Sequence, residues 1–239
     1  MKVCRTALVA LVALASAGAS TGWAQDAKKA PPNNPVGIGS NWSNSVTKEG
    51  PAGGIELDKK QMELVQKVNA YFRDLPDLKG NFVQTNADGK TQRGKLFFKR
   101  PGRFRFDYSR PSRMIIVSDG TQLAIQDADV NSDERIELDQ TPFRVLLRQD
   151  VDLIRDARIL EVQEVDGVIV IALQDKSPDT IGRIKLHIAQ KPAMELKQWI
   201  TTDAQGLDTR LDISDLTKGE ELDAALFKPQ ALGLKRLQQ

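Results

Sequence analysis

Two hydrophobic periods divide the chain into a short helical part and a long strand part. Between Leu57 and Phe72, apolar side chains recur at steps of three and four residues, which predicts one amphipathic helix ending near Asp74 and Pro76. After Pro76 the period changes to two. Residues 103–108, for example, alternate aromatic with charged side chains, the pattern of a strand that buries one face.

Gly, Pro and Asp-Gly breakers punctuate this second part at hairpin spacing. They predict strands, the sixth having the weakest pattern, near residues 78–87, 91–99, 103–109, 113–119, 121–127, 134–139, 157–166, 168–175, 181–189, 194–203 and 207–216. No helix-length segments alternate with these strands, so we expect one antiparallel sheet rather than parallel βαβ units. A sheet this large, apolar on one face, has to curl or close to cover itself.

One interruption of the strand pattern carries its own apolar face. Thr141 and Pro142 have the residue types of a helix N-cap and a first helical position. Phe143, Leu146 and Leu147 then form a stripe at positions i, i+3 and i+4, and residues 151–154 extend the apolar supply. The segment predicts a short helical pair that plugs or caps the sheet.

The first 24 residues are typical of an export signal. Lys2 and Arg5 precede the uncharged run 6–19, and small residues lead up to Ala24, so we expect a secretory signal peptide at residues 1–24. The alternative is a membrane anchor, but the apolar run falls short of the roughly 20 residues that span a bilayer. Cys4 precedes the run and is not a lipoprotein cysteine. A periplasmic protein without a lipid anchor is expected.

Residues 25–54 are rich in Pro, Gly and Asn and poor in apolar residues, which predicts a disordered spacer. Trp42 within it is interpreted either as a docking anchor or as an incidental residue of a tail. The remaining residues, 55–239, are expected to form one folded domain.

Composition excludes several classes of function. Lys and Arg number 34 against 32 Asp and Glu, and without Lys2 and Arg5 the two signs balance, so no basic surface favours nucleic acid. The chain has one Cys and one His. This inventory excludes a Cys/His zinc site, a disulfide framework and a Cys–His dyad. No cofactor is expected, and nothing predicts an oligomer, so a monomer is expected.

Candidate reactive or ion-binding residues are few. Residues 127–133 resemble the start of a calcium-binding EF-hand loop, but Ser132 replaces its glycine and Leu138 its final glutamate. We interpret this segment as an acidic hairpin tip, with no metal site. His187 alternates with cations on the polar face of a strand and is predicted to be a surface residue. No serine motif or phosphate loop accompanies it, so an enzyme is not expected.

The strongest remaining signal is the apolar face of the predicted sheet. Its candidate inward side chains are Phe82, Leu96, Phe98, Phe104, Phe106, Tyr108, Ile116, Ile184, Leu186, Leu196 and Ile200. Two interpretations are open: a filled core, or an apolar cavity for an acyl chain. Spacing alone does not separate them.

Five stretches, in order, resemble the outer-membrane lipoprotein carrier (LolA) family. They are Phe82-Val83-Gln84, the Gly-x-Leu-x-x-x-Arg-Pro-x-x-Phe-x-Phe run at 94–106, Val117-Ser118-Asp119-Gly120 with Leu123, Thr141-Pro142-Phe143 with Leu147, and Phe227-x-Pro229. The match runs from about Leu57 to Pro229. Phe106 stands where the family usually has Trp.

The resemblance implies an unclosed antiparallel β-barrel of about eleven strands, with an N-terminal helix and a short helical lid over a hydrophobic cavity. It implies a periplasmic carrier that takes lipoproteins, by their acyl chains, from an inner-membrane ABC exporter to an outer-membrane receptor or membrane. Arg100 would hydrogen-bond to the lid, where Phe143, Leu146 and Leu147 cover the cavity. Three other hypotheses remain: a carrier or sensor of another lipid or glycolipid, a ligand-free structural or signalling domain, and a hydrolase.

Overall fold

A computed structural model describes residues 54–178, 180 and 182–230. The predicted signal peptide, Trp42 and all of the predicted spacer except its last residue lie outside the described residues. The sheet's eleven strands are β1 (Leu78–Thr85), β2 (Thr91–Lys99), β3 (Arg103–Tyr108), β4 (Met114–Asp119), β5 (Gln122–Asp127), β6 (Ser132–Glu137), β7 (Ala157–Val165), β8 (Val168–Asp175), β9 (Arg183–Ala189), β10 (Glu195–Thr202) and β11 (Asp208–Lys218).

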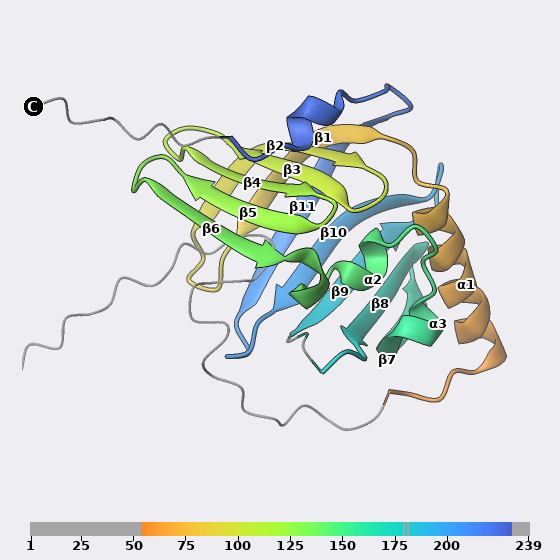
Figure 1. The fold of residues 1–239 in the computed structure, drawn as a ribbon. Helices are drawn as coiled ribbons and strands as arrows, with labels where there is room; N and C mark the ends of the chain where they lie inside the picture. Colours follow the sequence, from red (N-terminus) through yellow and green to blue (C-terminus); the bar gives the residue numbers. More distant parts are fainter. Residues whose placement is uncertain (1–53, 179, 181, 231–239) are drawn as a thin grey trace, which may run out of the picture. The chain divides into compact units, whose positions relative to one another are not determined.

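All eleven strands form one antiparallel sheet in the order β6-β5-β4-β3-β2-β1-β11-β10-β9-β8-β7. Strands β6 and β7 are therefore the two edges, and the curled sheet does not close on itself (Figure 1). The predicted fold class is confirmed, and most strand bounds agree within two residues. Strand β6 ends at Glu137, before the predicted end, because Leu138–Gln140 turn into the short 3-10 helix η2.

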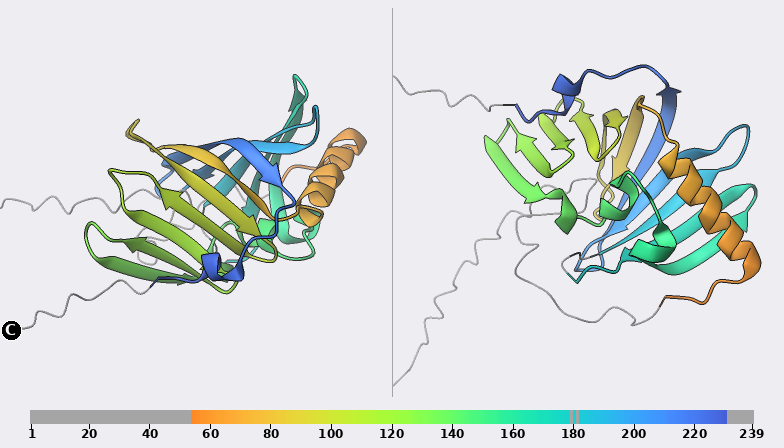
Figure 2. Two further views of the ribbon diagram at one scale, coloured as in Figure 1. Left: turned by 90° about the horizontal axis from the view of Figure 1, so that it is seen from above. Right: turned by 45° about the vertical axis from the view of Figure 1, so that its right-hand side comes forward.

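Helix α1 (Lys59–Arg73) begins at a capping box, in which the Asp58 carboxylate accepts from the Gln61 amide and the Gln61 side chain accepts from the Asp58 amide. Its apolar stripe of Leu64, Val65 and Phe72 is buried. The helix runs beside the C-terminal strands of the sheet (Figure 2). None of the helices in the described part of the chain combines the length and the hydropathy needed to cross a bilayer.

The connection between the two edge strands contains the predicted helical pair. Helix α2 spans Arg144–Leu147 and helix α3 spans Leu153–Asp156, each a single turn. The prediction that Thr141 caps the first helix was wrong. Its hydroxyl instead donates to the Leu138 carbonyl at 2.7 Å, so the side chain closes the preceding η2 turn and α2 begins three residues later.

The chain returns after β11 to cover the outer face of β3 and β4 with the 3-10 helix η3 (Ala224–Phe227). Phe227 is buried there, and the Arg105 guanidinium donates to the Leu226 carbonyl at 3.1 Å. Buried Val117 and Ala124 belong to this outer layer. The inner face of the sheet is thus left to form the main core.

Gly94 on β2 allows the Phe82 ring and the backbone of β3 to approach it closely. A methyl group at position 94 would lie 2.1 Å from the Asp107 carbonyl oxygen and 2.7 Å from that ring. We expect Gly94→Ala to lower the free energy of unfolding by about 1–3 kcal/mol, because strands β2 and β3 would have to separate. Chemical denaturation measures the loss. Gly89→Ala is the comparison variant. Its added methyl meets no atom within 4 Å, so any loss of stability there comes from the positive φ of 79° and not from packing. Equal losses at both positions would contradict the packing account.

Candidate functional site

An apolar cavity of about 70 Å³ lies between the inner face of the sheet, helix α1 and helix α2. Eight aromatic side chains contribute to its wall, together with aliphatic side chains from the same elements. The lining residues are Tyr71, Phe72, Leu75, Leu78, Leu96, Phe97, Phe98, Phe104, Phe106, Phe143, Leu146, Leu147, Leu196, Trp199, Ile213 and Leu216. This space is well below the roughly 300–1,000 Å³ of typical ligand pockets. The interior is therefore mostly packed, with a small residual cavity.

The predicted cavity residues separate into two groups. Leu96, Phe98, Phe104, Phe106 and Leu196 line the cavity. Five others, Phe82, Tyr108, Ile116, Ile184 and Leu186, are buried in the same core but do not reach the cavity wall. Ile200 belongs to neither group.

Phe82 supports the wall from behind. Its ring packs edge to face on Phe106 at 5.3 Å and on Tyr108 at 5.1 Å between centroids. The Tyr108 hydroxyl donates to the Gln84 side-chain oxygen, and burial raises the Tyr108 pKa well above its usual value. Phe82 and Tyr108 therefore support the aromatic wall by packing and do not themselves face the cavity.

Trp199 lines the cavity although the pattern pointed to Ile200. The β9–β10 register shifts between Leu196 and Gln198, so one extra residue is inserted and the alternation is displaced by one position. Leu196 and Trp199 consequently face inward, while Ile200 lies on the outer face beside Lys185. The bulge arises from the pairing of β10 with β9, and neither the turn residues nor the residue alternation of this segment indicates it.

Helix α1 also contributes to the cavity, although its three-and-four spacing predicts only a buried face. Tyr71 and Phe72 line its wall next to the sheet. The Leu196 amide donates to the Tyr71 hydroxyl oxygen at 3.0 Å, which ties the helix to β10 at its bulge. Burial raises the pKa of Tyr71, so this phenol stays protonated at neutral pH.

The residues predicted to cover the cavity are in contact with its wall. Phe143, Leu146 and Leu147 are buried and all three line the cavity. The Phe143 ring lies 5.2 Å from that of Trp199, which in turn lies 5.8 Å from Phe106. An aromatic contact chain therefore connects α2 with the sheet. We call residues 138–156, which run from η2 to α3, the lid segment.

Arg100 joins the end of β2 to the lid segment. Its guanidinium donates to the Arg148 carbonyl and, at 3.1 Å, to the Leu146 carbonyl. The Gly102 amide donates to the Leu147 carbonyl at 3.1 Å beside it. Partial burial lowers the pKa of Arg100, and the nearby Asp74 opposes this shift. Hydrogen bonds from the Arg100 guanidinium to the lid are the contact that the family resemblance implies.

Comparison with known proteins decides the family. Residues 73–230 match the family profile described as outer membrane lipoprotein carrier protein LolA, which covers more than half of the chain. The chain belongs to the LolA family. It is similar to the outer-membrane lipoprotein carrier protein of Leptothrix cholodnii, at 30% identity over 74% of this chain and 81% of that relative. The protein of the same name from Ralstonia nicotianae is 28% identical over 70% of this chain and 83% of its own length.

Among solved structures, a LolA superfamily protein from Nitrosomonas europaea covers 71% of this chain and 97% of its own, at 15% identity and a TM-score of 0.44. The family assignment itself comes from the sequence match. The Phe106 ring of this LolA-family chain contacts the rings of Phe82, Phe104 and Trp199, so an indole from β10 lies next to it.

The remaining candidate sites lie away from the cavity. Residues 128–131 form the turn between paired strands β5 and β6, as interpreted for an acidic hairpin tip. The Asp129 carboxylate accepts from the Arg113 amide, and Asp133 pairs with Arg135. Over the described residues, no cluster of three metal-ligating side chains occurs. His187 is half-buried rather than exposed on β9, and burial lowers its pKa.

Proposed function

We propose that this LolA-family chain carries lipoproteins through the periplasm by sheltering their acyl chains in the cavity under the lid segment. The observation that supports this most directly is an apolar, aromatic-walled cavity whose cover is fastened by Arg100. The relatives named outer-membrane lipoprotein carrier protein support the same role. The proposed work is binding and hand-over, in which no covalent bond is made or broken.

The proposal requires the cavity to widen. An acyl chain has to be kept from water, because each buried CH₂ is worth about 0.8 kcal/mol. The cavity of about 70 Å³ does not accommodate such a chain. Because Phe143, Leu146 and Leu147 form one wall, displacing the lid segment enlarges the space without breaking a strand pairing. The structure then corresponds to the carrier without cargo.

In this role the donor is an inner-membrane ABC exporter and the acceptor is an outer-membrane receptor or the membrane itself. We propose that the chain is exported by the signal peptide at residues 1–24 and works as a monomer. Hand-over needs an acceptor that binds the acyl chains more tightly than the carrier does. Neither nucleic acid nor a cofactor takes part.

The decisive experiment is lipoprotein release from inner-membrane vesicles that contain the ABC exporter. We expect the purified chain to bring a triacylated lipoprotein into the soluble fraction as a stable complex. The matched control is the same cargo with its acylated cysteine replaced by serine, which should not form a complex. Release that is equally efficient without the acyl chains would overturn the proposal. A different lipid or glycolipid found by native mass spectrometry of periplasmic material would favour the alternative carrier or sensor.

A further inference from the structure

The lid segment connects the two edges of the unclosed sheet. It leaves the N-terminal strands, β1–β6, at edge strand β6 and enters the C-terminal strands, β7–β11, at edge strand β7. If helix α2 moves away from the cavity, it separates from the N-terminal strands, from the C-terminal strands, or from both. The polar contacts on the two sides differ in kind.

On the side of the N-terminal strands, the described polar contacts to α2 end on backbone carbonyls. Arg100 donates to the carbonyls of Leu146 and Arg148, and the Gly102 amide donates to that of Leu147. No carboxylate forms an ion pair with Arg100 within the described residues. When these bonds break, the half-exposed guanidinium can turn to water, and the carbonyls at the end of a one-turn helix can be hydrated.

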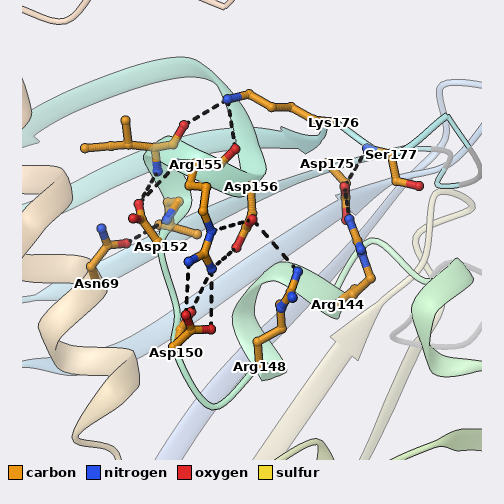
Figure 3. A network of polar contacts seen from close by, with 12 residues as sticks. Asn69, Arg144, Arg148, Asp150, Asp152, Arg155, Asp156, Asp175, Lys176 and Ser177 are labelled. Carbon is orange, nitrogen blue, oxygen red and sulfur yellow. Dashed lines mark hydrogen bonds and ion pairs between the residues drawn. The ribbon is translucent and has the colours of Figure 1, made fainter.

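On the side of the C-terminal strands, α2 is held by a two-pronged ion pair. The Arg144 Nε and Nη2 atoms donate to the two oxygens of Asp175, at the end of β8, at 2.9 and 2.7 Å. The Asp175 side chain is fully buried, whereas that of Arg144 is 22% exposed. The Ser177 amide also donates to Asp175 at 2.7 Å (Figure 3). Separating Arg144 from Asp175 would leave an uncompensated buried carboxylate, which is strongly unfavourable.

Helix α3 adds further contacts on this same side. The Leu153 amide donates to the Asn69 side chain of α1 at 3.0 Å, and Asn69 is buried. Lys176, next to Asp175, donates from its ammonium group to the Ile154 and Arg155 carbonyls. Its backbone amide donates to the Asp156 carbonyl at 3.1 Å. Figure 3 shows the Asn69 and Lys176 side chains directed at α3.

From this asymmetry we infer that the lid segment is a flap hinged on the C-terminal strands, with Arg144 as the positioning residue that keeps α2 attached to Asp175 of β8. The Arg100 side is the one that opens. The inference rests on the proposed function only in that cargo entry provides the reason to open. It predicts that an open lid segment separates from β2 and β3 while remaining next to β8.

The test measures two distances with spin labels, without any lipoprotein present. Exposed Gln149 in the lid segment is paired with exposed Lys95 on β2, or with exposed Arg183 at the start of β9, the strand that pairs with β8. Each label is attached to an introduced cysteine in a Cys4→Ser background. Arg100→Leu should increase the population of long 149–95 distances about tenfold while leaving the 149–183 distribution unchanged.

Asp175→Asn should instead broaden the 149–183 distribution, since the neutral amide offers one acceptor oxygen in place of two charged ones and holds Arg144 more weakly. Glu161→Gln removes the carboxylate of the exposed Lys185–Glu161 pair on the outer face and should change neither distance. If Asp175→Asn does not fold, Arg144→Lys keeps the charge but not the two-pronged geometry, and it should broaden the same distribution to a smaller extent.

Two results would overturn the hinge. One is that Arg100→Leu broadens both distances equally. The other is that neither Asp175→Asn nor Arg144→Lys changes the 149–183 distance in folded protein. Because no cargo is present, a failure of lipoprotein release would leave these distances unaffected. The hinge and the proposed function can therefore fail separately.

Discussion

Phe143→Asp is expected to abolish binding of an apolar ligand and to lower the thermal midpoint by about 10 °C or more. Phe143 is 3% exposed, lines the cavity and contacts Trp199. Removing a buried Phe side chain costs roughly 3–5 kcal/mol. A carboxylate left in this apolar wall adds a desolvation cost, so the lid segment is expected to leave the sheet rather than bury the charge. Differential scanning calorimetry and titration with a fluorescent fatty-acid analogue measure the two effects.

Two companion variants separate the causes. Gln149→Asp places the same charge on an exposed position of the lid segment and should leave midpoint and binding unchanged. Phe143→Leu keeps the wall apolar and should retain most of the binding at a smaller loss of stability. Full ligand binding by Phe143→Asp, in protein that remains folded, would show that the lid segment is not part of the binding site.

Arg100→Leu is expected to speed uptake of the same fatty-acid analogue about tenfold or more, with only a small change in the thermal midpoint. The variant loses two hydrogen bonds from a cation, each worth roughly 1.5–3 kcal/mol. Part of this loss is offset, because the buried Arg100 Nε atom has no hydrogen-bond partner among the described residues and burial disfavours the charge of the guanidinium. The remaining loss affects the lid segment and not the strand pairing. Stopped-flow fluorescence measures uptake.

Lipoprotein transfer from inner-membrane vesicles should change with uptake, because the open population is the one that accepts and releases cargo. Arg100→Lys keeps the charge but cannot bridge both carbonyls in the same geometry, so an intermediate rate is expected. Arg93→Leu, at an exposed position of β2, is the matched control and should behave as the original protein. Unchanged uptake and transfer by Arg100→Leu, at unchanged stability, would reduce Arg100 to a residue that merely ends β2.

Local sequence was sufficient for most of the fold because its determinants are local. The alternation at residues 103–108 and the three-and-four spacing at residues 57–72 depend only on how successive side chains point along a strand or helix. Phe143, Leu146 and Leu147 were recognisable as one apolar face for the same reason, and all three line the cavity. The motif matches added the family and the expectation for Arg100.

Only the tertiary structure decided that Tyr71, Phe72 and Trp199 join the predicted side chains at the cavity. The bulge between Leu196 and Gln198 arises in the pairing of β10 with β9, and it brings Trp199 rather than Ile200 inward. Arg144 and Asp175 are 31 positions apart and carry no shared pattern. They meet only because the sheet remains unclosed and the lid segment has to cross between its edges. Periodicity fixes which face a residue occupies, whereas the meeting of distant faces depends on curvature and register, which are properties of the whole sheet.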